Sequence, residues 1–234
     1  MNPQWAELAA AAGRPLDESQ QQCLAQYLDL LLAANQRMNL TRITDRAAAE
    51  LHHVADSLTL LPFLPAGSHR IADVGSGGGV PGIPLAIARP DSGVLLIEST
   101  RKKSAFLTTA ITELGLGNVK VSDKRAEEIA RTGSRESFDV VTARAVATLE
   151  FLVEYCLPLV KVGGKMLAMK GPRVADEIPA AKRAIRLLGG GETQIAAVSL
   201  PGTDGHVIVE IIKQAKTPDR YPRPPAEQKG RPIG

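Results

Sequence analysis

Hydrophobic positions change their spacing once along the chain, near residue 70. In the first 66 residues they recur every three or four positions, as at Leu24, Leu28 and Leu31, and Asp17 precedes this run as a helix N-cap would. A second helix is expected over Ala47–Leu61, because prolines follow at its end. This part of the chain shows no strand-like pattern, so we predict a helical N-terminal segment.

After residue 70, short apolar runs alternate with helical stretches. The expected strands are Ile71–Val74, Gly93–Ile97, Val119–Ser122, Phe138–Thr142, Gly164–Met169, Thr193–Ser199 and His206–Lys213. The expected helices are Pro84–Ala88, Arg101–Leu114, Ala126–Arg131, Leu149–Leu157 and Val174–Leu188. Strands and helices that alternate at this spacing predict an α/β fold, with a doubly wound and mostly parallel seven-stranded sheet.

The last two strands depart from this alternation. Only the short loop Leu200–Gly205 separates them, and it contains Pro201 and Gly202. Strands joined by so short a loop must run antiparallel, so the sheet is expected to end in a hairpin.

Three segments are therefore expected: an N-terminal helical subdomain over residues 1–66, an α/β domain over 67–215 and a tail over 216–234. The tail contains five prolines with interspersed lysines and arginines, which predicts a mobile or extended segment. Its basic side chains could attract phosphate groups or simply add solubility; they are Arg220, Arg223, Lys229 and Arg231.

Composition narrows the class of protein only moderately. The 234 residues are 44% hydrophobic and 23% charged, and the net charge is only +3, so a surface that binds polyanions everywhere is not expected. Cys23 and Cys156 lie far apart, which predicts two reduced thiols in a cytoplasmic protein. We expect no metal site and no membrane association, because no ligand cluster, signal peptide or long apolar run is visible.

The most informative segment joins the first expected strand to the next helix. Five glycines fall within Gly75–Gly82, and Asp73 precedes them. Such a turn brings backbone atoms close to a ligand that a Cβ would exclude, which predicts a nucleotide-type cofactor site. Glu98 ends the second strand, where an acceptor for ribose hydroxyl groups belongs.

The glycine pattern alone would also suit NAD(P), which binds through its pyrophosphate. A carboxylate at Asp73 suits a cationic ligand better, and Pro81 and Pro84 remove N–H donors that a pyrophosphate needs. The terminal hairpin is also usual in S-adenosylmethionine-dependent methyltransferases. We therefore expect S-adenosyl-L-methionine as the cofactor, with an NAD(P)-dependent oxidoreductase as the alternative.

The end of the fourth strand bears on the methyl acceptor. It contains neither the Asn/Asp-Pro-Pro-aromatic segment typical of amine methylation nor a cysteine nucleophile, and it offers Arg144. This suits an acceptor with a free lone pair and no proton to lose, such as guanine N7, although other acceptors also react without an identified base.

Several segments together resemble the bacterial 16S rRNA (guanine-N7) methyltransferases of the RsmG (GidB) type. The segments that carry the resemblance are Asn39-Leu-Thr41, His53-Val-Ala-Asp-Ser57, Asp73-Val-Gly-Ser-Gly-Gly-Gly-Val-Pro-Gly-Ile-Pro-Leu85, Ser137–Ala145 and Met169-Lys-Gly171. The resemblance covers about residues 20–213. It implies methylation of guanine N7 in the decoding-region loop of 16S rRNA, with 16S rRNA or the small ribosomal subunit as partner. We separately expect a monomer.

The resemblance also implies roles for individual residues. The turn and the following strands would hold the cofactor through Asp73, Gly75, Ser76, Gly77, Gly79, Val80, Glu98, Ala126, Glu127 and Arg144. Arg144 and Lys170 are the candidate catalytic residues that position the target. This chain departs from the family pattern at three places: His52 replaces a common Arg, Glu98 a frequent Asp, and Gly205-His206 a Glu-Arg pair.

Basic residues near the carboxyl ends of the strands are the candidate RNA contacts. They are Arg101, Lys102, Lys103, Lys170 and Arg173, with a solvated charged surface as the simpler interpretation of the first three. His53 and Asp56 lie three residues apart on one helical face, and we expect them to anchor the N-terminal helices to the sheet rather than to bind substrate. A non-catalytic ribosome-assembly module and a small-molecule methyltransferase stay open as alternatives.

Overall fold

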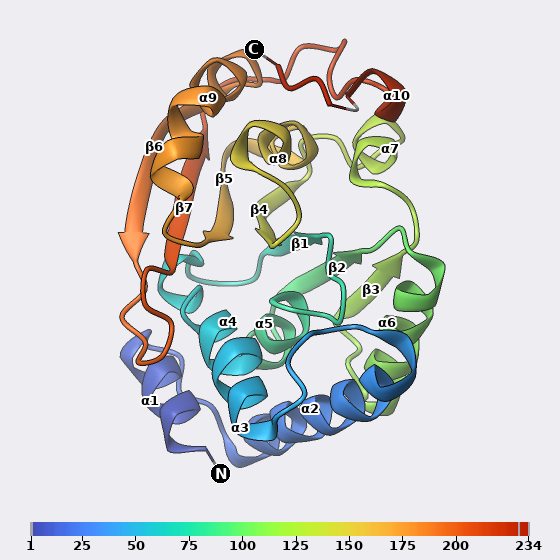
Figure 1. The fold of residues 1–234 in the computed structure, drawn as a ribbon, viewed down its shortest axis with the longest axis vertical. Helices are drawn as coiled ribbons and strands as arrows, with labels where there is room; N and C mark the ends of the chain where they lie inside the picture. Colours follow the sequence, from blue (N-terminus) through green and yellow to red (C-terminus); the bar gives the residue numbers. More distant parts are fainter. Residues whose placement is uncertain (1, 229, 234) are drawn as a thin grey trace.

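The computed structural model describes residues 2–228 and 230–233. Seven strands form one sheet in the order β3-β2-β1-β4-β5-β7-β6 (Figure 1). The strands are β1 (Arg70–Val74), β2 (Gly93–Ile97), β3 (Val119–Ser122), β4 (Phe138–Arg144), β5 (Val160–Lys170), β6 (Gly190–Ala197) and β7 (Val207–Lys213). The first five are parallel, and β7 pairs antiparallel with both β5 and β6. The predicted α/β fold with a terminal antiparallel hairpin is therefore confirmed.

Helices cover both faces of the sheet (Figure 1). They are α1 (Pro3–Ala11), α2 (Glu18–Met38), α3 (Arg46–Ala49), α4 (Asp56–Leu58), α5 (Gly82–Ala88), α6 (Arg101–Glu113), α7 (Ala126–Arg131), α8 (Leu149–Cys156), α9 (Val174–Leu187) and α10 (Pro225–Gln228). Asp17 caps α2 as predicted, and its side chain and that of Gln20 bond each other's backbone N–H groups in a capping box.

Two hydrophobic clusters lie on the two faces of the sheet. One joins α1, α2, α5 and α6 to the sheet and includes Trp5, Tyr27 and Leu96. The other joins α7, α8 and α9 to the opposite face and includes Leu152 and Ile185. The N-terminal helices thus share their core with the sheet. The boundaries expected at residues 66 and 215 stay predictions.

The second predicted helix is not a single α-helix. Its path is divided into α3, the π-helical η1 (Glu50–Ala55), α4 and the 3-10 turn η2 (Leu61–Phe63). A π-helical turn is wider than an α-helical one, and such turns are frequent at functional sites because they redirect side chains. Here the wider turn contains His52 and His53, both of which contact Arg144 of β4.

The tail, which the prolines predict to be mobile or extended, packs against the rest of the protein in its described residues. The guanidinium of Arg135 donates to the carbonyl oxygens of Thr217 and Tyr221, each at 2.6 Å. The buried Glu154 of α8 forms an ion pair of 2.7 Å with Arg223. These pairings hold the tail against α8 and against the loop between α7 and β4, and Arg223 supplies the cation that buried Glu154 needs. Lys229, one of the expected tail cations, lies outside the described residues.

The register of the sheet explains why distant residues meet at one edge. Val74 of β1 pairs with Ile97 of β2 and with Ala143 of β4. Consequently the residues that follow these strands, including Gly75 and Glu98, emerge side by side. Met169 of β5 likewise lies beside the end of β4. Within the described residues, no helix is both long and apolar enough to cross a membrane.

Candidate active site

The glycine turn after β1 requires its glycines for two physical reasons. Gly75, Gly77 and Gly79 have positive φ angles of 72°, 56° and 99°, which side chains disfavour. A Cβ on Gly75 would also lie 2.5 Å from Cγ2 of Val146. The turn therefore passes directly beneath the loop that follows β4.

The N–H groups of this turn are largely satisfied within the protein. Those of Gly75 and Ser76 donate to the carbonyl oxygen of Ile97 at 2.8 and 3.1 Å, and that of Gly77 donates to Glu98 Oε2 at 3.0 Å. Those of Gly79 and Val80 donate to the carbonyl oxygen of Ser76. A pyrophosphate needs such donors, so this turn fits a dinucleotide poorly.

Asp73 lies beneath the turn and does not line a hollow. Its side chain is fully buried, and its two oxygens accept from Gly82 N and Thr142 Oγ1, both at 3.1 Å. Burial raises the pKa of this carboxyl to about 6, although the two hydrogen bonds oppose the shift. Asp73 therefore supports the turn from behind, and its role in holding the cofactor stays a prediction.

Two adjoining hollows flank the turn, and they bring most of the predicted cofactor residues together. The turn hollow, about 260 Å³, runs along the glycines; among its lining residues are Gly75, Ser76, Gly77, Val80, Glu98, Lys103 and Arg144. The α7 hollow, about 250 Å³, lies on the other side of Gly75; its lining includes Glu98, Ala126, Glu127, Val146 and Tyr155. Gly75 and Glu98 line both, so the two hollows adjoin, and we call them together the cofactor groove.

Two carboxylates give this groove its acidic character. Glu98 accepts from the backbone N–H of Gly77 and, at 2.7 Å, from that of Thr100, which fixes the orientation of its carboxylate. Glu127 is 5% exposed, and burial raises the pKa of its carboxyl. A carboxylate that accepts two backbone bonds keeps further lone pairs, so Glu98 can still accept from ribose hydroxyl groups.

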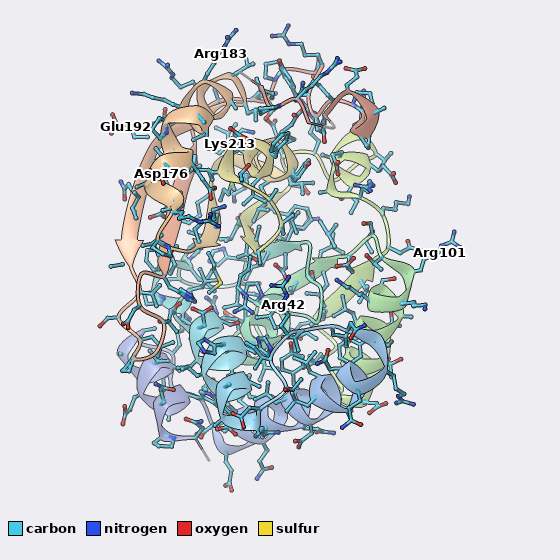
Figure 2. The ribbon with its side chains drawn as sticks, viewed as in Figure 1. Arg42, Arg101, Asp176, Arg183, Glu192 and Lys213 are labelled. Atoms are coloured by element: carbon cyan, nitrogen blue, oxygen red, sulfur yellow. The ribbon has the colours of Figure 1, made fainter. Side chains whose placement is uncertain are left out.

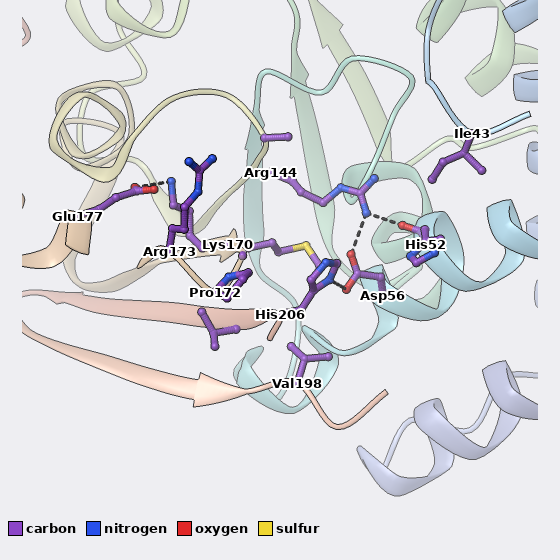
Figure 3. A pocket seen from close by; sticks show the side chains of 14 residues that line it. Ile43, His52, Asp56, Arg144, Lys170, Pro172, Arg173, Glu177, Val198 and His206 are labelled. Carbon is purple, nitrogen blue, oxygen red and sulfur yellow. Dashed lines mark hydrogen bonds and ion pairs between the residues drawn. The ribbon is translucent and has the colours of Figure 1, made fainter. Parts of the chain in front are cut away.

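A third hollow of about 590 Å³ lies beyond Arg144, at the ends of β4, β5 and β7 (Figure 3). We call it the rim hollow; residues that line it include His52, Asp56, Arg144, Ala145, Met169, Lys170, Arg173, Glu177 and His206. Arg144 and Ala145 line both this hollow and the turn hollow. Arg144 therefore stands where the cofactor groove and the rim hollow meet.

Arg144 is held by the segment around η1. Its NH1 donates to Asp56 Oδ2 at 2.8 Å and to the carbonyl oxygen of His52, and its NH2 meets His53 Nδ1 at 3.1 Å (Figure 3). Asp56 is 2% exposed, so this ion pair is largely removed from water. The expectation that His53 and Asp56 anchor the N-terminal helices to the sheet is confirmed, with Arg144 as the group that they hold.

The position of the proton on His53 follows from its partners. Arg144 can only donate, so His53 Nδ1 must accept, and Nε2 carries the hydrogen that is donated to Thr41 Oγ1 at 2.9 Å. Burial, with the charge of Arg144 beside it, lowers the pKa of His53 to about 4. The ring is therefore neutral near pH 7.

Lys170 lies on the opposite side of the rim hollow from Asp56 (Figure 3). Its ammonium group forms an ion pair of 2.6 Å with Glu177 of α9 and donates to the carbonyl oxygen of Ala147 at 3.0 Å. Glu177 also accepts from the N–H of Leu149 at 2.6 Å. This network ties the loop after β4 to the start of α9.

The rim hollow offers no evident nucleophile and no uncommitted carboxylate. Asp56 and Glu177 are each paired with a cation, Arg144 and Lys170 respectively. Cys156 is fully buried in the core, which raises the pKa of its thiol, and Cys23 lies on α2. Within the described residues, no group of His, Cys, Asp and Glu has the arrangement of a metal site.

The structure does not gather every predicted residue. Gly79 packs within the turn, where a Cβ would lie 2.5 Å from Ile83 Cδ1, and it lines neither hollow of the groove. Arg101 and Lys102 open α6 as exposed side chains, and Arg101 projects away from the molecule (Figure 2). Of this cluster, Lys103 alone lines a described hollow.

Sequence reasoning missed three residues of these hollows. Tyr155 reaches the α7 hollow from α8, and Val146 covers Gly75. Glu177 pairs with Lys170 from α9. Each comes from a segment whose placement depends on the order of strands in the sheet, so no local sequence pattern predicted it. The one available signal was that α9 begins shortly after Lys170, which places Glu177 near that lysine.

The fold and the glycine turn define the class I S-adenosylmethionine-dependent methyltransferase fold. A SAM-dependent O-methyltransferase from Thermotoga maritima shares it with a TM-score of 0.52 and 14% identity, over 80% of this chain and 72% of that chain.

The chain belongs to the family described as rRNA small subunit methyltransferase G (GidB), whose model matches residues 20–207. A ribosomal RNA small subunit methyltransferase G from Chloroflexus aggregans is 45% identical over 93% of this chain and 92% of its own length. A protein of the same name from Lactobacillus johnsonii is 40% identical over the whole of both chains.

Proposed function

We propose that this protein transfers a methyl group from S-adenosyl-L-methionine to guanine N7 in the decoding-region loop of 16S rRNA. The observation that carries the proposal is the shared wall formed by Arg144 and Ala145, which separates a glycine-lined groove from a second hollow. Family membership supports rRNA as the substrate, because the relatives are named as small-subunit rRNA methyltransferases.

The groove fits the cofactor by its chemistry. Gly75 lines both hollows, Glu98 can accept from the ribose, and Ala126 and Glu127 line the far end, where the resemblance places adenine. The N–H groups of the turn are mostly satisfied internally, so a ligand without phosphate suits it. When bound, S-adenosylmethionine supplies an electrophilic methyl group on a sulfonium.

The chain's own residues would then position the acceptor. Guanine N7 attacks with an in-plane lone pair and has no proton to lose, so the site needs orientation more than a general base. The paired states of Asp56 and Glu177 agree with this requirement. We assign target positioning to Arg144 and Lys170, which stand on two sides of the rim hollow.

The basic residues at the rim would hold the RNA itself. Lys103 and Arg173 line the groove and the rim hollow respectively, and Arg101 and Lys102 extend the same edge at the start of α6. We place the enzyme in the cytoplasm as a monomer that acts on 16S rRNA or the small ribosomal subunit, without a metal.

The test is to map N7-methylguanosine in 16S rRNA from cells with and without the gene. Borohydride and aniline cleave the chain at such positions, and primer extension locates the breaks. A single cleavage in the decoding-region loop should disappear without the gene and return when it is restored. Identical cleavage patterns in both strains would contradict the proposal.

Cofactor choice needs a separate measurement. Calorimetry should show tight binding of S-adenosylhomocysteine and none of NAD(P)H, and the reverse result would favour an oxidoreductase. Arg144→Ala in the complementing gene addresses the non-catalytic alternative, because an assembly module should still work with this change while the methyltransferase should lose the modification.

A further inference from the structure

A cationic hollow lies at the C-terminal end of α9, whereas the rim hollow lies at the N-terminal end of this helix. It has a volume of about 700 Å³, and its walls come from α9 and from the C-terminal tail. The side chains that matter here are Arg183 and Arg186 of α9 together with Arg220, Tyr221, Arg223 and Ile233 of the tail. We call this site the α9–tail hollow.

The charge of this hollow is only partly compensated. Arg223 is neutralised by the buried Glu154. By contrast, Arg183, Arg186 and Arg220 are exposed, and none forms an ion pair with another residue of the described chain. Figure 2 shows Arg183 projecting from the surface into solvent. Within residues 2–228 and 230–233, three guanidinium groups around this concave surface thus lack an anionic partner.

The hollow is built by fixed contacts. The guanidinium of Arg220 lies 5.0 Å from the ring centroid of Tyr221, a ring that is itself 8% exposed. The backbone of Tyr221 is held by Arg135, and Ile233 packs into the core below α9. Because the contacts of Arg220 and Tyr221 are formed before binding, a ligand would lose less conformational entropy in meeting this wall of the hollow.

Helix stability alone does not account for this cluster. Cations in the last turn of a helix interact favourably with its dipole, which would explain Arg186. It would not explain why the tail folds back to bring Arg220 to the same hollow. Helix α9 and the tail are separated by more than thirty positions, and both place positive charges in this hollow. Positive charges that lie close together repel one another, and a bound anion would remove that electrostatic cost.

The geometry relates this hollow to the catalytic rim. Arg173, which lines the rim hollow, immediately precedes α9, and Arg186 is in its last turn. Thirteen residues of helix separate them, which corresponds to about 20 Å at 1.5 Å per residue. Helix α9 thus has an arginine at each end: Arg173 lines the rim hollow, and Arg186 lines the α9–tail hollow.

We propose that the α9–tail hollow binds the phosphate backbone of the RNA substrate at a second contact remote from the methylated base. Guanidinium groups match phosphate oxygens in paired hydrogen bonds, and three of them around a hollow suit a folded polyanion. The inference rests on the proposed function for the identity of the RNA. The second contact adds affinity and orientation and takes no part in methyl transfer.

The test compares two double variants that each remove two exposed cations. Arg183→Ala/Arg186→Ala alters the hollow, and Arg70→Ala/Lys120→Ala alters strands β1 and β3 away from it. Binding to 16S rRNA and to small ribosomal subunits is measured at several salt concentrations, beside the kcat for methyl transfer and the affinity for S-adenosylhomocysteine.

The hollow variant should bind RNA roughly tenfold more weakly than wild type, with a salt slope reduced by about 2, because two phosphate contacts are lost. Its KM for RNA should rise while kcat and cofactor affinity stay unchanged, and the control variant should resemble wild type. Equal losses in both variants, or no loss in either, would overturn the proposal. The proposal would also be overturned if the hollow variant bound RNA as tightly as wild type but lost binding to phosphatidylserine vesicles, because the hollow would then bind a lipid surface.

Failure of this inference is distinguishable from failure of the proposed function. If wild type binds and methylates the RNA while the hollow variant does so equally well, the second contact alone is wrong. If wild type neither binds nor methylates RNA, both proposals are wrong.

Discussion

At the scale of single residues, two positions carry most of the geometry of the site. Gly75 allows the turn after β1 to pass beneath Val146, and Arg144 joins the cofactor groove to the rim hollow. Both depend on partners that are distant in sequence. Gly75 has no room for a side chain, and Arg144 is oriented by the carboxylate of Asp56 and the ring of His53.

Replacing Gly75 by alanine should weaken cofactor binding at least tenfold. The new Cβ would meet Val146 Cγ2 at 2.5 Å, and the φ of 72° adds backbone strain of about 1 kcal/mol. Calorimetry with S-adenosylhomocysteine measures the effect. Gly67→Ala is the matched control, because Gly67 has a φ of 84° with no atom within 4 Å of the added Cβ.

Adding Val146→Ala to Gly75→Ala should recover part of the lost affinity, since it removes the colliding methyl group. If Gly75→Ala binds the cofactor as tightly as wild type, the groove described here is not the cofactor site.

His53 should make the folded protein less stable in acid. Its pKa is about 4 in the folded state and ordinarily 6.5, so between these values the unfolded chain binds a proton that the folded protein does not. Its contribution is therefore fully present above pH 6.5 and is lost as pH falls toward 4, by up to about 3 kcal/mol. Between pH 7.5 and 4.5, urea unfolding should show a smaller loss of stability in His53→Gln than in wild type.

Asp73 provides a control of the opposite sign. Its pKa is raised from 3.8 to about 6, so the folded protein binds the extra proton in this window and gains stability as pH falls through it. Asp73→Asn should remove that gain. A pH dependence that is identical in wild type and in both variants would show that neither group is shifted.

At the scale of elements, the tail and α8 are joined by a bidentate ion pair. Arg223 Nε and NH2 donate to the two oxygens of Glu154 at 3.0 and 2.7 Å, and the N–H of Arg223 donates at 2.8 Å. Tyr155, the next residue of α8, faces the α7 hollow. The tail therefore supports the helix that forms one wall of the cofactor groove.

Breaking this ion pair should destabilise the fold by about 3 kcal/mol, because Glu154 is 1% exposed and would be left buried without a cation. Arg223→Met should show this loss in thermal or urea unfolding. Arg223→Met/Glu154→Gln should lose less than the sum of its single variants. Arg220→Met, nearby but without an ion pair in the described chain, should lose under about 1 kcal/mol. Equal effects at positions 220 and 223 would contradict the assignment.

At the scale of the whole molecule, the N-terminal helices and the sheet form one packed body. Trp5, the single tryptophan, is 2% exposed in α1 and belongs to the same cluster as Leu96 of β2. Tyr27 of α2 donates its hydroxyl hydrogen to the carbonyl oxygen of Gly78 at 2.8 Å. The helical segment is thus coupled both to the core and to the glycine turn.

Unfolding should consequently be a single transition. Tryptophan fluorescence reports on α1, and far-UV circular dichroism reports on all helices and strands, so their urea midpoints should coincide. If fluorescence changes at a clearly lower urea concentration, the N-terminal helices form a separate unit and the boundary expected at residue 66 is a true domain boundary.

Much of this protein could be predicted from sequence because the decisive signals are local. Periods of apolar residues predicted the seven strands and the final hairpin, and Asp17 predicted the start of α2. The glycine turn predicted the place of the groove, since positive φ angles and close approach demand glycine itself. These features depend on neighbours within a few positions.

Other features were decided only by tertiary structure, because they depend on which elements become neighbours. Sheet order and register brought Glu98, Gly75, Arg144 and Lys170 to one edge. Packing placed Asp73 beneath the turn, where Gly82 and Thr142 donate hydrogen bonds to its oxygens. Likewise, the tail packs because buried Glu154 needs a cation, a requirement that exists only once α8 is in place.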